Sequence, residues 1–261
     1  MRTLLGFALA IAAAGPAAAG VQTKDVEYTY EGVTFKGQLA WDDATSGKRP
    51  GVLVVHEWWG LDDYAKMRAH ELAKLGYVAF ACDMYGVGKL AKHPDDARKM
   101  VMEVRNNIAT WRGRAKTALK VLADDEHVDA TKLAAMGYCF GGSTALELAY
   151  SGADLKAVVT FHAALPTPTP EQAKAIKAKI LVCHGADDKF IPQESIDKFK
   201  AALADAKVDL KFESYPGAVH SFTVKGADAH MLPGMAYNAD ADAKSWQAMK
   251  DLFAETLGGK K

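Results

Sequence analysis

A single thiol in the segment GYCFGG stands where a nucleophile could act. Cys139 lies between an apolar stretch and a helical pattern, with Gly137 and Gly141 two residues to either side. In the corresponding Gly-x-Ser-x-Gly turn, the nucleophile stands on a sharp strand-to-helix bend, and glycines flank it because side chains would collide there. The start of the helix also favours a thiolate through its dipole and free N–H groups. The pattern indicates either a nucleophilic cysteine or a structural cysteine in a glycine-rich turn.

Two carboxylates and a histidine downstream could complete the chemistry of that thiol. Asp187 and Asp188 follow the apolar stretch ILVCHG, and His220 lies in YPGAVHSF, after the last expected strand. A thiol that attacks an ester needs a base, and the base needs a group that orients it. The order nucleophile, acid, histidine is that of α/β-hydrolases. Because each residue follows a strand, all should lie at the same edge of the sheet, and either aspartate could be the acid.

Alternating strands and helices must bring these residues together. Two runs of alternating polar and apolar residues, separated by Glu31 and Gly32, predict an antiparallel hairpin at the N-terminal side. From Gly51 onward, apolar runs typical of strands buried on both faces alternate with helical patterns. We therefore predict an α/β fold with a mostly parallel central sheet that helices cover on both faces. The expected strands are 25–30, 33–41, 51–57, 77–83, 132–139, 155–163, 179–185 and 209–217, and the expected helices are 62–76, 94–123, 140–152, 192–206 and 239–257.

The first residues have the pattern of an export signal. Arg2 precedes a short apolar stretch, which ends in the small residues Ala17 and Ala19. This order of features favours a secretory signal peptide over a buried apolar helix. We predict a signal peptide over residues 1–19, a single domain over residues 20–261, and a periplasmic or secreted mature protein. No later stretch is long and apolar enough to span a bilayer, so we expect no membrane association after signal cleavage.

The composition argues against several classes of partner. The chain of 261 residues carries 32 basic and 32 acidic side chains and therefore has no net charge. A neutral chain gives no reason to expect nucleic acid or an anionic membrane surface as a partner. Three cysteines leave at least one thiol without a disulfide partner in the chain. Cys82 and Cys183 belong to expected strands and should be buried and inert. His56, His162 and His184 lie near strand ends but lack the spacing of a zinc motif, so we expect no metal and no cofactor.

Four motifs in order give the chain a family resemblance. HEWWG, GYCFGG, GADDKFIP and GAVHSF together resemble the dienelactone hydrolase family of the α/β-hydrolase fold, and the resemblance extends from about Val26 to Leu257. It implies a small ester or lactone as substrate, cleaved by a carboxylic ester hydrolase of the carboxymethylenebutenolidase kind. We expect the protein to be a monomer.

The resemblance also assigns roles to the candidate residues. The family uses a Cys-Asp-His triad, which implies Cys139 as nucleophile, Asp188 as acid and His220 as base. The family motif places the acid four residues before a proline, and Asp188 stands four residues before Pro192. Asp187 would then cap or solvate the loop.

Residues of HEWWG would assist the thiol. Glu57 matches a family glutamate that lies against the resting thiol, where it would keep Cys139 protonated and protected from oxidation. The alternative is a solvated loop glutamate. The resemblance implies the backbone N–H groups of Trp58 and Phe140 as oxyanion donors, and such donors stabilise the charge of a tetrahedral intermediate.

The match departs from the family at the substrate-binding arginines. Family members that act on dienelactone carry an arginine four residues after the catalytic histidine, and this chain has Val224 there, followed by Lys225. A lysine supplies charge but not the bidentate fork of an arginine. A second family arginine has no certain counterpart, and Arg98 and Arg105 are the nearest candidates.

Two further residues are candidate substrate contacts. Tyr85 follows an expected strand, where a role in a surface loop is the favoured alternative, and Ser221 follows His220 directly.

Three functions remain open at this point. The first is hydrolysis of a carboxylic ester or enol-lactone through a thioester on Cys139. The second keeps the same triad in a general short-chain carboxylesterase or thioesterase, which the valine at position 224 favours. The third is a non-catalytic binding protein on a hydrolase fold, for which a broken triad would be expected, whereas all three positions are filled here.

Overall fold

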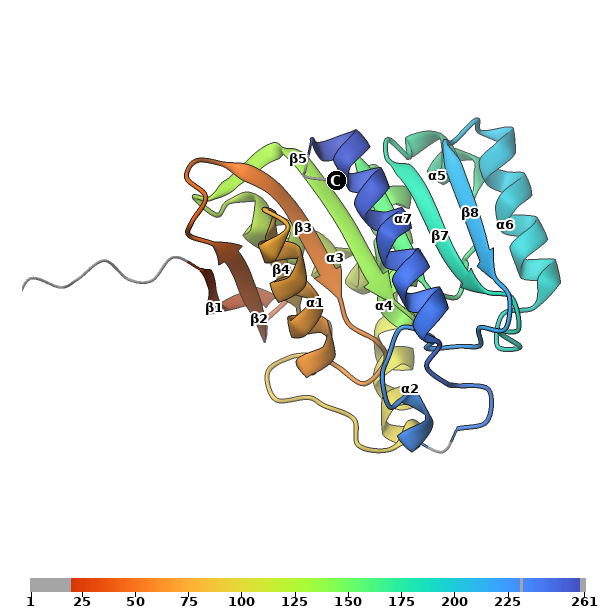
Figure 1. The fold of residues 1–261 in the computed structure, drawn as a ribbon. Coiled ribbons are helices and arrows are strands. Elements are labelled where there is room, and N and C mark those ends of the chain that lie inside the picture. Colours follow the sequence, from red (N-terminus) through yellow and green to blue (C-terminus); the bar gives the residue numbers. More distant parts are fainter. Residues whose placement is uncertain (1–19, 231, 259–261) are drawn as a thin grey trace, which may run out of the picture.

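The computed structural model describes residues 20–230 and 232–258 and shows one eight-stranded sheet between helices (Figure 1). The predicted signal peptide, residues 1–19, lies outside the described residues. The strand order is β1-β2-β4-β3-β5-β6-β7-β8. The strands are β1 (Val21–Tyr30), β2 (Val33–Asp42), β3 (Arg49–Val55), β4 (Val78–Cys82), β5 (Val128–Tyr138), β6 (Ala157–Phe161), β7 (Lys179–Gly185) and β8 (Leu210–Tyr215).

The sheet is antiparallel at one edge and parallel elsewhere. β1 and β2 form the expected hairpin, which joins the rest through an antiparallel pairing of β2 with β4. β3 pairs in parallel with β4 on one side and with β5 on the other, and the pairings from β5 through β8 are all parallel as well. The predicted mostly parallel α/β fold with an N-terminal hairpin is confirmed. Every residue of β4 and β6 is buried, which explains their unbroken apolar sequences.

Helices cover both faces of this sheet. The side chains of α1 (Asp63–Lys74) and α7 (Ala239–Leu257) belong to one buried apolar cluster. A second cluster, on the other face, includes α2 (Pro94–Arg105), α3 (Ile108–Ala123), α4 (Phe140–Tyr150) and α6 (Gln193–Asp205). Figure 1 shows α1 and α7 in front of the sheet. The short helices α5 (Pro170–Ala175) and η1 (Ala227–His230) lie in loops.

Two segments differ from the sequence prediction. The single helix expected over 94–123 is broken at Asn106 and Asn107, because the Asn107 side chain accepts hydrogen bonds from two N–H groups of the next turn and caps α3. No helix was expected between 163 and 179, but α5 begins there at Pro170. Thr169 and Gln172 form a capping box there.

The parallel strands direct their carboxyl ends toward one loop-rich edge, which lies at the bottom of Figure 1 together with α2. Ligands bind at this edge in open α/β sheets. No helix in the described part of the chain is both long and apolar enough to cross a bilayer. Within the same residues, no cluster of three or more His, Cys, Asp or Glu side chains could hold a metal ion.

Candidate active site

The thiol of Cys139 stands on a strained bend between β5 and α4. Cys139 has φ 51° and ψ −113°, a conformation that side chains rarely adopt. The bend is tight because a Cβ on Gly137 would collide with the backbone of Gly141, and a Cβ on Gly141 would collide with the carbonyl oxygen of Val55. Glycine is therefore required at both positions. The sharp strand-to-helix turn predicted from the glycine spacing is present.

His220 connects the thiol to a carboxylate. Its Nδ1 atom lies 2.7 Å from Oδ2 of Asp188, in the loop after β7. The other oxygen of Asp188 accepts the backbone N–H of Phe190 at 2.9 Å, which fixes the carboxylate. Asp188 is buried, whereas Asp187 is exposed. Of the two aspartates that the order of residues left open, Asp188 is the one that contacts His220.

The electrostatics of His220 suit a thiolate–imidazolium pair. Burial opposes charge on the ring. The charge and hydrogen bond of Cys139, together with those of Asp188, nevertheless raise the pKa of His220 well above its ordinary value. Because Nδ1 faces Asp188, Nε2 is the ring nitrogen left for the thiol. The site therefore favours a protonated His220.

Glu57 lies within this cluster as a buried side chain. Its Oε1 atom accepts a hydrogen bond of 2.9 Å from Ser221, which is fully buried beside His220. Burial raises the pKa of Glu57 to about 7, and His220 and the Ser221 hydroxyl oppose the increase. Glu57 is thus a buried carboxyl group rather than a solvated loop residue. That it lies against the resting thiol stays a prediction, and so does Ser221 as a substrate contact.

The two expected oxyanion donors belong to the segment after β3 and to the start of α4. Phe140 is the first residue of α4, so its N–H has no acceptor within the helix. The segment of Trp58 is held by Tyr85, whose hydroxyl donates to the Trp58 carbonyl at 3.0 Å. His56 connects the same segment to the same loop, because its Nε2 accepts the backbone N–H of Met84 at 3.1 Å. Tyr85 is buried and positions this loop, a role the sequence did not indicate.

A cavity of about 390 Å³ opens onto Cys139 and His220. Its wall is mostly apolar. Two cations on α2, Arg98 and Arg105, belong to it, whereas Lys225 is exposed and lies over the ring of Tyr237. The lining comprises Trp58, Pro94, Arg98, Val101, Arg105, Cys139, Phe140, Ala164, Phe190, Ile191, His220, Leu232, Pro233 and Met235.

Arg105 is held in place at this cavity. Its Nη2 atom donates to the hydroxyl of Ser143 at 3.2 Å, and its guanidinium lies 5.2 Å from the ring centroid of Trp111. Arg98 is exposed at the cavity mouth. Of the cations considered from sequence, the structure therefore brings Arg98 and Arg105 to the thiol and leaves Lys225 outside the lining.

Backbone strain marks one residue whose role the sequence did not predict. Five non-glycine residues in the described ranges have positive φ, and three of them, Cys139, His162 and Ser221, belong to this region. Strain of this kind gathers at functional sites. His162 directly follows β6, and its fully buried ring lies 5.3 Å from the ring of His220. From the sequence, His162 was considered only as a metal ligand and set aside, although its place at a strand's carboxyl end was a signal for the site.

Comparisons with known proteins agree over nearly the whole described chain. A model of the dienelactone hydrolase family matches residues 35–257. Protein usf of Aquifex pyrophilus is 31% identical over 237 residues, which cover 89% of this chain and 98% of that protein. Two solved structures superpose with a TM-score of 0.89, and each match covers 91% of this chain and 99% of the other. They are m3DLH, 44% identical, and P91, a dienelactone hydrolase-like promiscuous phosphotriesterase from metagenomic libraries, 41% identical.

Proposed function

This chain belongs to the dienelactone hydrolase family, and we propose that it cleaves carboxylic esters or enol-lactones through a thioester formed on Cys139. Membership makes the protein a hydrolase of ester or lactone type. The observation that supports the thioester mechanism is the arrangement of Cys139 and His220 at the wall of one cavity, with the carboxylate of Asp188 on Nδ1 of His220.

The first half of the reaction forms the thioester. The sulfur of Cys139 attacks the carbonyl carbon while the thiol proton resides on Nε2 of His220. The N–H groups of Trp58 and Phe140 stabilise the negative charge that develops on the carbonyl oxygen. The carbon–oxygen bond then breaks, and the leaving alcohol or enol takes the proton from His220. Asp188 keeps the ring oriented through Nδ1 throughout.

The second half releases the acid. A water molecule attacks the thioester carbon and gives a proton to Nε2 of His220, and the same oxyanion donors receive the charge. The carbon–sulfur bond breaks, the carboxylic acid leaves, and the Cys139 thiolate again faces a protonated His220. No group outside the chain is needed other than water.

Trapping the acyl group tests this mechanism. We expect an activated acetyl ester to leave an acetyl group on the peptide containing Cys139 after rapid acid quenching, as measured by mass spectrometry. Cys82 and Cys183, which are buried, serve as controls within the same digest. Cys139→Ala should abolish turnover while the circular dichroism spectrum persists. Full turnover in this variant, or acetylation of other residues alone, would contradict the proposal.

A second candidate keeps this chemistry but accepts neutral substrates. The mostly apolar cavity wall and the valine at position 224 favour a short-chain carboxylesterase or thioesterase. Arg98 and Arg105 favour an anionic substrate instead. A panel of ester pairs that differ only by a carboxylate on the acyl chain separates the two candidates by their ratio of kcat/KM.

A further inference from the structure

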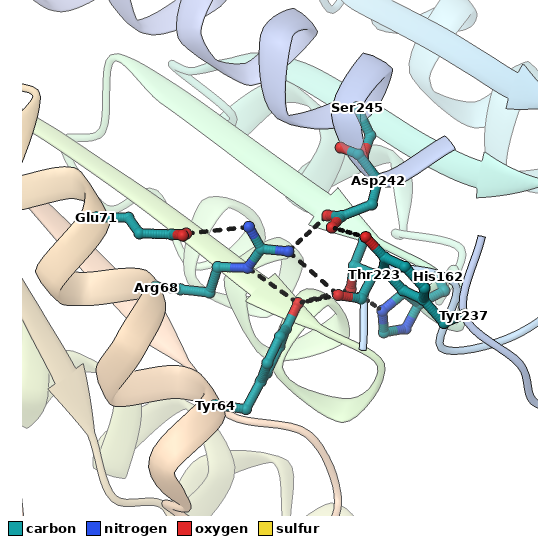
Figure 2. A network of polar contacts seen from close by, with 8 residues as sticks. All are labelled: Tyr64, Arg68, Glu71, His162, Thr223, Tyr237, Asp242 and Ser245. Carbon is teal, nitrogen blue, oxygen red and sulfur yellow. Dashed lines mark hydrogen bonds and ion pairs between the residues drawn. The ribbon is translucent and has the colours of Figure 1, made fainter. Parts of the chain in front are cut away.

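A buried polar chain lies behind the candidate site, between α1 and α7 (Figure 2). Arg68 is 6% exposed and pairs with Asp242 of α7. Its Nε donates to the hydroxyl of Tyr64 at 3.1 Å. The Tyr64 hydroxyl in turn lies 2.7 Å from Oγ1 of Thr223, and that hydroxyl lies 2.9 Å from Nε2 of His162. The chain thus leads from a fixed guanidinium to a histidine ring beside the triad.

The direction of these hydrogen bonds follows from the guanidinium, which can only donate. Arg68 occupies the Tyr64 oxygen through Nε and reaches the Thr223 carbonyl through Nη2, at 3.2 Å. The Tyr64 hydroxyl therefore donates a hydrogen bond to Oγ1 of Thr223, which is the shorter of its two contacts with Thr223. The Thr223 hydroxyl in turn donates a hydrogen bond to Nε2 of His162.

A histidine that accepts at Nε2 must carry its proton on Nδ1 if it is neutral. Burial, and then the charge of His220, lower the pKa of His162 well below its ordinary value, so the ring is neutral. Its Nδ1 atom has no hydrogen-bond partner among the described residues and lies 3.7 Å from Oε1 of Glu57. The opposite tautomer would aim a lone pair at this carboxylate.

The other ionisable groups near Glu57 and His162 come from several elements. His220 faces both groups and favours ionised Glu57, whereas Asp62 and a deprotonated Tyr64 would oppose that ionisation. Arg68 disfavours a charged His162. Only His162 has a ring nitrogen without a hydrogen-bond partner beside Glu57 within the described ranges.

We propose that the chain Arg68–Tyr64–Thr223 fixes His162 as the Nδ1–H tautomer, which makes His162 a positioning residue that favours the ionised form of Glu57. This inference rests on the proposed function, because an ionised Glu57 would stabilise the protonated His220 that the proposed mechanism uses. It adds a control of the site by Tyr64 and Arg68 of α1 and by Thr223 after β8, and none of these three residues lines the cavity.

Nitrogen NMR of the histidine rings tests the tautomer without any enzyme activity. In the ¹⁵N-labelled mature protein, the His162 signals, assigned by their loss in His162→Gln, should show a protonated Nδ1 and an unprotonated Nε2. Thr223→Val, which keeps the shape but loses the hydroxyl, should convert part or all of His162 to Nε2–H. Thr223→Ser should keep the wild-type tautomer. A wild-type ring protonated on Nε2, or an unchanged ring in Thr223→Val, would overturn the proposal.

The pH dependence of kcat/KM tests the effect on Glu57. We expect an inflection in the profile near pH 7, which should be absent in Glu57→Gln. In Thr223→Val the inflection should move to higher pH, by about half a pH unit or more. Tyr64→Phe, which cuts the chain one link earlier, should move the inflection in the same direction if Thr223→Val does not fold. Tyr237→Phe removes a hydroxyl that contacts only Asp242 among these residues and should leave it in place.

The two proposals fail in different ways. An inflection that stays in place in both Thr223→Val and Tyr64→Phe overturns the link to Glu57. Turnover that survives in Cys139→Ala overturns the proposed function instead, and the tautomer measured by NMR is unaffected by that result.

Discussion

Oδ2 of Asp188 lies 2.7 Å from Nδ1 of His220, although 32 positions separate the two residues in the chain. Asp187, its neighbour, is exposed. Replacement of Asp188 should therefore impair catalysis, whereas replacement of Asp187 should not. The contact fixes both the orientation of the ring and which nitrogen faces the thiol.

We expect Asp188→Asn to lower kcat/KM by about two to four orders of magnitude, because an amide can present its N–H to Nδ1 and stabilise the wrong tautomer. Asp187→Asn is the matched control and should change kcat/KM by less than about twofold. Steady-state kinetics with one activated ester measures both. A comparable loss in the two variants would show that the loop, rather than the carboxylate of Asp188, matters.

The sequence predicted a feature well when the residues that form it are close together in the chain, and poorly when they are far apart. The bend at Cys139 depends on local sterics, because its glycines lie within two residues of Cys139 in the chain. Their spacing alone therefore predicted it. The contact of Ser221 with Glu57 spans 164 positions and depends on how two loops meet at the sheet edge. The pair of Arg68 with Asp242 spans 174 positions and requires α1 and α7 to pack on the same face. Neither arrangement leaves a local pattern.

The broken helix has a different cause. Residues 94–123 keep a helical alternation of apolar side chains, and asparagine is only mildly unfavourable within a helix. Whether Asn107 continues a helix or caps the next one depends on where α3 packs against α4, which the periodicity does not specify.

Gly141 should not tolerate a side chain. A Cβ there would meet the carbonyl oxygens of Val55 and His56, which belong to the backbone and cannot turn away. We expect Gly141→Ala to lower the free energy of unfolding by about 1–3 kcal/mol and to lose most activity, since the thiol would shift with the bend. Urea denaturation measures the stability. Gly20→Ala is the control, because its Cβ would meet nothing within 4 Å.

The buried carboxyl of Glu57 should make stability depend on pH. Its pKa rises from 4.5 to about 7 on folding, so the folded protein resists ionisation. The unfolded chain loses this proton near pH 4.5 and the folded one near pH 7. The contribution of protonated Glu57 is therefore fully present below about pH 4.5 and is lost as the pH rises through 7. The loss amounts to about 3 kcal/mol.

Glu57→Gln isolates this effect. The free energy of unfolding of the wild type, minus that of the variant, should fall by about 3 kcal/mol between pH 4.5 and pH 8. Glu103→Gln, with the same change of charge on an exposed part of α2, should show no comparable slope. Urea denaturation at a series of pH values measures the difference. A flat difference for Glu57→Gln would mean that the carboxyl is ionised in the folded protein throughout this range.

The charge preference of the cavity should depend on Arg105. The guanidinium is anchored by Ser143 and Trp111, so it can receive a substrate carboxylate with little loss of side-chain freedom. We expect Arg105→Gln to lower kcat/KM about tenfold for an ester with a carboxylate on its acyl chain, and to leave the neutral ester nearly unchanged. Arg98→Gln should have a smaller effect, because that side chain is exposed and screened by solvent.

Two controls separate charge from packing in this comparison. Lys99→Gln removes a cation from the same helix but outside the cavity lining, and should leave the ratio of anionic to neutral substrate unchanged. Arg105→Lys keeps the charge without the fork and should recover only part of the preference. Equal losses on both esters in Arg105→Gln would mean that the side chain only packs against the site. An unchanged ratio in both Arg105→Gln and Arg98→Gln would favour the neutral short-chain esterase, since Val224 stands where family members that act on dienelactone carry an arginine.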